Sequence, residues 1–367
     1  MQTTGAKATT VRNQAEREGA ALAAAKTAKA EAAFEACGFE ADGYKKPETV
    51  IDFSRAIRQT TDIGSVTEAA QELGINAYAA QEPGTNAYAA QEPGTNAYAA
   101  QEPGTNADVS DYEDANSAVN ISVDEVCCKH QTDRRPCSDP EKEPKQVRNT
   151  VIHVQHRDRG YILTGETVAA AIRLLMGFLL ANNLLGAYPI VFFSDGAKNI
   201  KNAVEEYFSF APYRYILDWP HLCKKSSEFL SSSIKGMNKR NEVHAMVKRH
   251  LWRGDVAGAI SYLDALPAEY VKSADWLVKL KDFLDRNRVN IPCYAMRKKL
   301  KLRISSNIGE KANDRVVSSR QKHNGMAWSK EGSIGLAGLC AAHINGEMTD
   351  WLHGQSIRFA FDDTKIA

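Results

Sequence analysis

Three acidic residues stand where a carboxylate could bind a metal ion. Asp124 lies inside the alternating segment Ile-Ser-Val-Asp-Glu-Val, Asp195 directly follows the apolar run Phe-Phe-Ser, and Glu310 lies near the start of a helical stretch. Carboxylate oxygens are the hard ligands that Mg²⁺ prefers, and two such ions roughly 4 Å apart can hold the attacking and the leaving oxygen of a phosphoryl transfer. These residues therefore predict metal-dependent chemistry on a phosphodiester.

Each of the three residues also has an ordinary structural explanation. Asp195-Gly196 is a frequent turn and helix-cap pair, and Glu310 could be the partner in a capping box. Asp124 could instead lie exposed at a strand edge, with Glu125 on the opposite face of the strand. An active site is favoured because all three positions agree with one topology, and a charge inside a strand is costly unless it is paired or binds a cation.

Asp218 and His221 form a second candidate pair in Asp-Trp-Pro-His, at the end of a predicted strand. Their spacing can bring both side chains back toward the same site, where His221 could position DNA or a catalytic water. A structural hydrogen bond between Asp218 and His221, which only fixes the junction between strand and helix, explains the pair equally well. Both interpretations stay open.

The strands and helices that could position these residues alternate from Asn120 onward. Alternating or continuous apolar segments predict strands at 120–127, 150–156, 161–164, 189–194 and 213–217. Helices are predicted at 167–183 and 197–208, and after the last strand at 222–235, 241–253, 256–263, 274–286 and 310–322. Three strands, a helix, a strand, a helix, a strand and then helices is the order of the ribonuclease H-like fold. We therefore expect an α/β fold with such a core.

The net charge of +1 hides an uneven charge distribution. Acidic residues outnumber basic ones roughly two to one up to Glu125, and the ratio is reversed by a similar factor from His221 to Lys330. Basic clusters such as the run at 297–303 could neutralise DNA phosphates and give salt-sensitive affinity. Taken alone, such clusters are more often solvated helix faces.

An Ala-rich segment and a set of repeats precede this region. Residues 1–75 are expected to be helical or partly disordered, and 67–75 predict a short helix that is either half of a helix-turn-helix or an ordinary surface helix ending at Gly74. The decapeptide Asn-Ala-Tyr-Ala-Ala-Gln-Glu-Pro-Gly-Thr then begins at Asn76, Asn86 and Asn96. Each copy has one large apolar side chain, which is too little to offset its ordering entropy, so residues 76–118 are expected to be a disordered linker.

The apolar stretches and the cysteines indicate in which cellular compartment the protein is expected. The longest apolar stretch, Val168 to Leu185, is interrupted by Arg173 and two asparagines, which favours a buried helix over a membrane span. Seven cysteines without regular spacing fit a reducing cytoplasm, and no membrane association is expected. A zinc module could use Cys127, Cys128, His130 and Cys137. The adjacent cysteines lack the Cys-x₂₋₄-Cys spacing of zinc knuckles, which disfavours such a module.

Five segments between about Asn120 and Leu352 carry a family resemblance. They are Ile-Ser-Val-Asp-Glu-Val, Thr-Val-Ile-His-Val-Gln, Phe-Phe-Ser-Asp-Gly-Ala-Lys-Asn-Ile, Ile-Leu-Asp-Trp-Pro-His-Leu-Cys-Lys-Lys and Ser-Ser-Asn-Ile-Gly-Glu-Lys-Ala-Asn-Asp-Arg. Together they resemble bacterial transposases of the ISLre insertion-sequence family, distant relatives of Mutator-like transposases. The resemblance implies a DNA transposase in which Asp124, Asp195 and Glu310 are the DDE triad that binds Mg²⁺ or Mn²⁺.

The resemblance also implies the surroundings of this triad. Mutator-like relatives carry a Cys/Asp-x-x-His motif where this chain has Asp218 and His221. A catalytic core at 119–221 and 303–352 would be interrupted by an all-helical insertion at 222–302. The protein would act as a homo-oligomer on transposon ends and target DNA. By the same analogy, the phosphate contacts are Lys224, Lys225, Arg315, Arg320 and Lys322.

The chain departs from the family in two places. Glu125 follows the first aspartate where relatives tend to carry a second Asp. The N-terminal part that recognises transposon ends in the family is replaced by the Ala-rich segment and the repeats. We therefore expect either an active transposase or an inactive, truncated remnant that still binds DNA.

Overall fold

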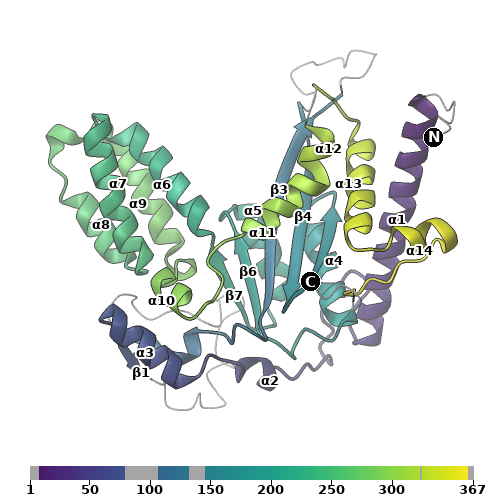
Figure 1. Ribbon diagram of the computed structural model, residues 1–367, viewed down its shortest axis with the longest axis horizontal. Helices are drawn as coiled ribbons and strands as arrows, with labels where there is room; N and C mark the ends of the chain where they lie inside the picture. The colour runs from purple at the N-terminus through teal and green to yellow at the C-terminus, as the bar shows by residue number, and fades with distance from the viewer. Residues whose placement is uncertain (1–7, 79–105, 132–144, 323–324, 363–367) are drawn as a thin grey trace.

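A mixed sheet of five strands lies at the centre of the computed structural model, which describes residues 8–78, 106–131, 145–322 and 325–362 (Figure 1). The strands are β3 (Val119–Lys129), β4 (Gln146–His156), β5 (Arg159–Gly165), β6 (Ile190–Ser194) and β7 (Tyr213–Leu217), in the spatial order β5-β4-β3-β6-β7. β4 is antiparallel to β3 and β5, whereas β6 is parallel to β3 and β7. The predicted α/β class and all five predicted strands are confirmed.

The two faces of the sheet carry different side chains because alternate strand residues point to opposite sides. On one face, Ile121 and Val123 of β3 are buried among residues of α1 (Ala8–Ala36), α4 (Val168–Ala181) and α5 (Lys198–Phe208). On the other face, Val126 packs against α11 (Asn307–Asn313), the π-helical turn η4 (Asp314–Ser318) and α13 (Lys330–Ile344). Asp124 belongs to this second face.

The Ala-rich helix α1 is part of the core. Leu22 and Phe34 are buried, and α1 crosses α4 so closely that a Cβ atom on Gly177 would lie 2.4 Å from Cβ of Ala30. Of the two expected states, helix or partial disorder, the described residues of this segment form the helix, and their small side chains allow a close helix crossing. α4 is the buried helix that the longest apolar stretch predicts. None of the described helices combines the length and the apolar character that crossing a membrane requires.

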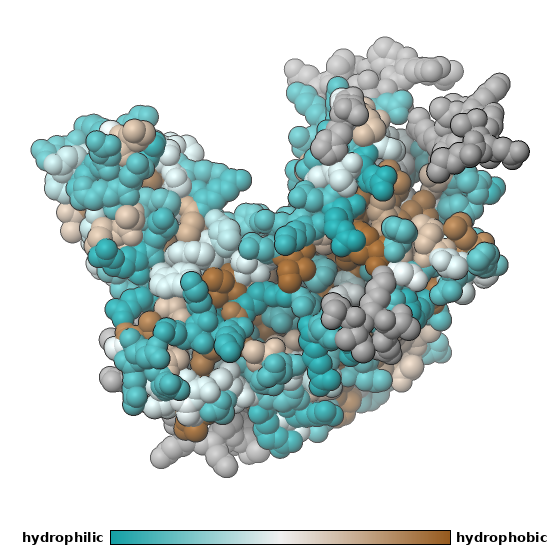
Figure 2. Space-filling model, in the orientation of Figure 1, coloured by the Kyte–Doolittle hydropathy of each residue, from teal (hydrophilic) through white to brown (hydrophobic). Residues whose placement is uncertain are grey.

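After β7 the chain forms a helical arm. It consists of α6 (Trp219–Ser233), α7 (Met237–Trp252), α8 (Val256–Asp264), α9 (Ala274–Arg286) and α10 (Tyr294–Lys299). Leu230, Val247 and Leu280 are fully buried in a hydrophobic cluster that the arm shares with Phe193 and Ile216 of the sheet, and the four long helices predicted here are confirmed. Figure 1 shows the arm beside β7, and Figure 2 shows a wide notch between the arm and the side of the molecule that carries α12 (Ser319–Gln321) and α13.

Short elements of the N-terminal region pack below the arm. After α2 (Ser54–Ile57), helix α3 (Ile63–Leu73) ends at Gly74, which has the left-handed φ of 65° that the sequence predicts for a glycine stop. Strands β1 (Asn76–Tyr78) and β2 (Asn106–Asp108) pair in parallel at the two ends of the repeats. Residues 79–105, which hold most of the repeats, lie outside the described residues. Because β1 and β2 are paired, the chain enters and leaves residues 79–105 at one place. The repeats therefore do not separate the N-terminal region from the core.

Glu113 forms a buried ion pair although it lies within the range predicted to be a linker. Its carboxylate accepts hydrogen bonds from Nη1 and Nη2 of Arg297 at 3.1 and 2.5 Å, and Nε of Arg214 lies 3.3 Å from it. Glu113 is 2% and Arg297 1% exposed. The predicted linker therefore ends earlier than residue 118, because the sequence beyond the repeats contains residues with specific buried partners.

Candidate functional site

Three aspartates lie in one row across the sheet. β3 and β6 pair in parallel with Ser122 opposite Phe193, and β7 continues this arrangement beside β6. If this pairing is extended beyond the last paired residues, Asp124 lies opposite Asp195, and Asp195 lies opposite Asp218. All three side chains then point to the sheet face that carries α11. The sheet alone therefore brings three carboxylates together where β6 and β7 end.

Asp124 is half-buried and surrounded by other charged groups. Its Oδ1 accepts a hydrogen bond from the next backbone N–H at 2.8 Å, and its Oδ2 accepts one from the side-chain amide of Asn313 at 2.5 Å. Burial, together with the charges of Asp195 and Glu310, raises the pKa of Asp124 to about 6 against the opposing effect of His221. The charges of Asp195, Glu310 and His221 therefore all influence this one carboxylate.

Among the described residues, only one carboxylate oxygen of Asp195 accepts a hydrogen bond. Its Oδ1 accepts a hydrogen bond from the N–H of Ala197 at 2.9 Å, so the turn explanation holds for this oxygen. Gly196 has a φ of 81°, and a Cβ atom there would lie 2.7 Å from Cδ1 of Leu217, so the sharp exit from β6 requires glycine. Oδ2 of Asp195 has no partner among the described residues and the side chain is exposed, which leaves this oxygen available to a ligand.

Glu310 approaches the row of aspartates from α11. This helix lies directly on β3, since a Cβ atom on Gly309 would lie only 2.6 Å from Cβ of Ser122. The capping-box explanation of Glu310 is wrong, because Ser306 at the N-cap of α11 makes no side-chain capping hydrogen bond. The Glu310 side chain is 47% exposed and is free to turn toward the site.

We expect Gly309→Ala to lower the free energy of unfolding by about 1–3 kcal/mol, the usual cost of overpacking. The added Cβ would overlap with the Cβ of Ser122, which cannot rotate away because it is bonded directly to the β3 backbone. Urea denaturation measures the loss. Gly338→Ala on α13 is the matched control, because its Cβ would meet nothing closer than Thr164 Oγ1 at 3.8 Å. An unchanged midpoint for Gly309→Ala would contradict the close contact between helix and strand.

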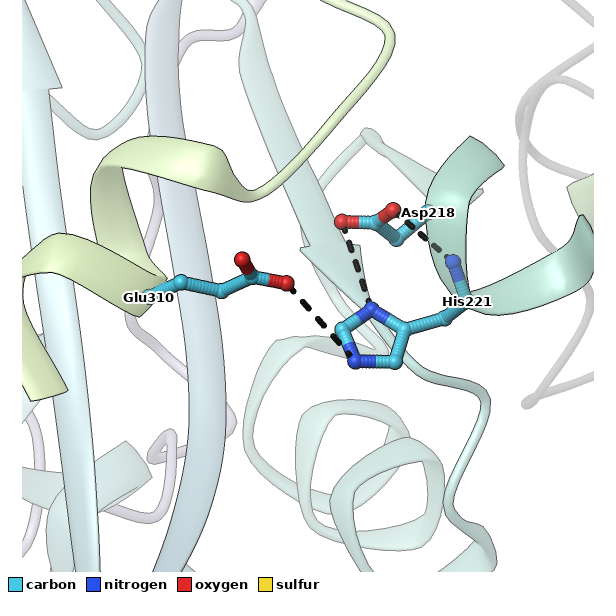
Figure 3. Close-up of side chains that lie close together, drawn as sticks. All are labelled: Asp218, His221 and Glu310. Carbon is cyan, nitrogen blue, oxygen red and sulfur yellow. Dashed lines mark hydrogen bonds and ion pairs between the residues drawn. The ribbon is translucent and has the colours of Figure 1, made fainter. Parts of the chain in front are cut away.

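His221 lies between two carboxylates (Figure 3). Its Nδ1 is 3.5 Å from Oδ2 of Asp218, and its Nε2 is 3.8 Å from Oε1 of Glu310. The neighbouring Asp218 carboxylate raises the pKa of His221 although burial opposes this. Ligand atoms of the three residues lie within 4.8 Å of one another, close enough to hold a metal ion, and no other such group occurs among the described residues. The ligand atoms of the predicted metal-binding set, Asp124, Asp195 and Glu310, therefore do not all lie within this distance of one another.

The carboxylate of Asp218 is fully buried and already occupied within the fold. Its Oδ1 accepts from the N–H of His221 at 3.3 Å, and its Oδ2 accepts from the N–H of Ser306 at 2.6 Å and from the Ser306 hydroxyl. Beside it, the N–H of Trp219 donates to the carbonyl of Ile304 at 3.2 Å. These bonds tie the start of the helical arm to the chain that enters α11, and so fix where Glu310 stands.

Two residues of the site are not predicted from the sequence. Ser306 binds Asp218 across a long stretch of chain, and no local pattern indicates that contact. Asn313 binds Asp124 and lies three residues after Glu310, on the same face of α11. That spacing is the signal that could have identified Asn313.

The five residues expected to contact phosphates are all exposed. Lys224 and Lys225 lie on α6, shortly after His221, and Lys225 is 4.0 Å from the carboxylate of Glu228. The other three follow Glu310 along the chain: Arg315 on η4, Arg320 on α12 and Lys322 just beyond it. Lys224 and Lys225 thus share α6 with His221, and the other three lie on or just beyond the helical turns that continue α11.

The cysteines considered for a zinc module have other surroundings. Sγ of Cys128 lies 3.2 Å from Oγ of buried Ser333, and Cys127 points to the opposite side of β3. Cys127, Cys128 and His130 are not part of the metal-binding group found in the described ranges, and Cys137 lies outside them.

No protein-family model matches the chain, and no curated protein matches it. The geometry of the site is therefore the main ground on which a function can be assigned.

Proposed function

We propose that this protein is a DNA transposase that cleaves transposon ends and joins them to target DNA by DDE chemistry. The observation that carries the proposal is the packing of α11 directly on β3, which places Glu310 beside the strand that holds Asp124, while Asp195 follows the neighbouring parallel strand β6. The strand order β5-β4-β3-β6-β7 is the one expected of a ribonuclease H-like core, which supports this finer fold assignment. The resemblance to ISLre transposases covers the segments that hold all three residues.

Asp124, Asp195 and Glu310 would hold Mg²⁺ or Mn²⁺ through their carboxylate oxygens. Asp124 supports this fit, because a half-buried carboxylate beside two other anions is unfavourable unless a cation is present. When bound, the divalent ions would activate a water and stabilise the charge that develops on the attacked phosphate. Asp218 suits this role less, because binding a cation would compete with the hydrogen bonds that Oδ2 accepts from Ser306.

Asp218 and His221 are better suited to positioning. Asp218 holds the imidazole of His221, which presents Nε2 toward Glu310. From there His221 can orient a water or hold a proton close to the attacked phosphate. The exposed lysines and arginines on α6, η4 and α12 would bind the DNA backbone.

The reaction needs no covalent bond to the protein. In the first step a water oxygen adds to phosphorus and the P–O3′ bond at the transposon end breaks, which frees a 3′-hydroxyl. In the second step this hydroxyl attacks a phosphorus of the target strand and displaces the O3′ of the target. Two ends must be joined at one target, so we propose that a homo-oligomer assembles on the DNA.

The test is a cleavage assay with the purified full-length protein. The substrates are DNA fragments that flank the gene on either side, incubated with Mg²⁺ or Mn²⁺. We expect nicks at one position on each fragment, free 3′-hydroxyl ends, and no cleavage in EDTA. If both fragments are bound but neither is cut with either metal, the protein is the non-catalytic DNA-binding remnant that the sequence leaves as the alternative.

A further inference from the structure

A groove of about 560 Å³ lies beside the helical stretch that carries Glu310. This volume falls within the roughly 300–1,000 Å³ of ligand-binding sites. The groove runs between η4 and α12 on one side and α13 and the start of α14 (Met348–Gly354) on the other. Its lining includes Arg315, Arg320, Leu336, Leu339, Cys340 and Met348. One wall is thus cationic, and the other is mostly apolar with His343 among its residues.

The cationic wall has no counterion in the fold. No carboxylate in the described part of the chain pairs with Arg315 or Arg320, whereas buried Arg297 is paired with Glu113. Arg320 and Cys340 line the groove from opposite walls. Two unpaired guanidinium groups beside a groove suit a phosphate, which they can bind through paired N–H donors.

The groove is also within reach of DNA held at the proposed catalytic site. Arg320 follows Glu310 along one helical stretch, at a separation of roughly 15 Å along its axis. A nucleic-acid strand covers that length with about four nucleotides. A phosphate alone would leave the apolar wall unused, whereas a nucleotide has both a charged group and a flat, weakly polar base.

We propose that this groove binds one unpaired nucleotide of the DNA substrate, with its phosphate on Arg315 and Arg320 and its base against Leu336 and the other apolar residues of α13. The inference rests on the proposed function, since it names a second contact with the same DNA. It places an unpaired nucleotide about four positions from the phosphate that is cleaved.

The first test measures binding of a fluorescein-labelled oligothymidylate to the full-length protein in EDTA, over a range of salt concentrations. For Arg315→Gln combined with Arg320→Gln, the slope of log affinity against log salt should become shallower by about 0.7, because the two arginines share one phosphate and each phosphate contact to a single strand contributes about 0.7. Arg58→Gln, an exposed arginine of the N-terminal region, is the matched control and should leave the slope unchanged. An unchanged slope in the double variant overturns the proposal.

The second test examines the base. Oligonucleotides with abasic positions should bind the wild-type protein about fivefold more weakly than oligothymidylate, and Leu336→Glu should remove this difference. An oligonucleotide with 4-thiothymidine should cross-link to the α13 peptide that contains Cys340, a readout that requires no variant to fold. Equal binding of the abasic strand by wild type, or cross-links only outside α13, overturns the proposal.

These experiments separate the two proposals. If the protein binds no DNA in any form, the proposed function fails and the groove inference fails with it. If DNA is bound and cut normally but the groove variants behave as wild type, only the groove inference fails. A change confined to the oligomeric state of the groove variants would show that a second copy of the chain fills the groove, and would also overturn the inference.

Discussion

Asp195→Asn is expected to lower the rate of DNA cleavage by about 10³-fold or more while leaving DNA affinity unchanged. The amide keeps the size of the side chain and its oxygen can still accept the Ala197 N–H, so the turn into α5 is retained. The substitution removes the charge of an exposed carboxylate whose second oxygen has no other partner in the described residues. Cleavage of the flanking DNA with Mg²⁺ gives the rate, and fluorescence anisotropy in EDTA gives the affinity.

Asp282→Asn is the matched control for this experiment. Asp282 lies exposed on α9, so the same chemical change there should alter neither cleavage nor binding. Cleavage by Asp195→Asn at the wild-type rate would exclude this residue from the catalytic site. Loss of binding together with cleavage would instead indicate a folding defect, which circular dichroism would detect.

The second large effect is expected for Glu113→Gln, which should lower the free energy of unfolding by about 3–5 kcal/mol. The amide cannot neutralise Arg297, which is 1% exposed and would be left as a buried charge without its partner. The pair joins the chain before β3 to α10, so its loss weakens the contact between the sheet and the arm. Urea denaturation at neutral pH measures the difference.

The matched control is Asp285→Asn, which breaks an exposed pair with Arg288 at 2.9 Å and should cost no more than about 1 kcal/mol. Burial opposes the ionisation of Glu113, but Arg297 and Arg214 hold its pKa below the ordinary value. Such a carboxylate stabilises the fold at neutral pH and loses this effect as the pH falls through its lowered pKa. The difference in the free energy of unfolding between wild type and Glu113→Gln should therefore become smaller in acid. A difference that became larger would contradict the ion pair.

Local patterns predict the strands and the arm well. The alternation in β3 and the continuous apolar run of β6 identify both strands to within two residues, because one sheet face or both are buried. The arm helices are also visible from their apolar periodicity, although α6 and α7 begin at Trp219 and Met237, three and four residues before the predicted starts. The positions of Asp124 and Asp195 follow directly, since each lies within or directly after a strand that the sequence reveals.

Contacts between segments that are distant in the chain could not be predicted from the sequence. Ala-rich composition does not distinguish a disordered segment from α1, which relies on close crossings with α4 and α13 at Gly177 and Gly335. Glu113 looks like one more acid after an acidic repeat, and its partner Arg297 looks like part of a solvated basic cluster. Asp218 shows the same limit, since its pairing with His221 is local and is one of the two explanations that the sequence offers, whereas its bond to Ser306 is not local.

The bonds that tie Trp219 to Ile304 and Asp218 to Ser306 also determine how freely this protein can diversify. The segment between these two points leaves the sheet and returns to it at one place, and the Glu113–Arg297 pair and the hydrogen bond from the Tyr294 hydroxyl to the Leu217 carbonyl hold α10 against the sheet as well. Residues can therefore be gained, lost or exchanged within the arm while the chain re-enters α11 at the same place. Substitutions and insertions in the arm can therefore change its surface while the positions of the acidic side chains on the sheet and on α11 stay the same.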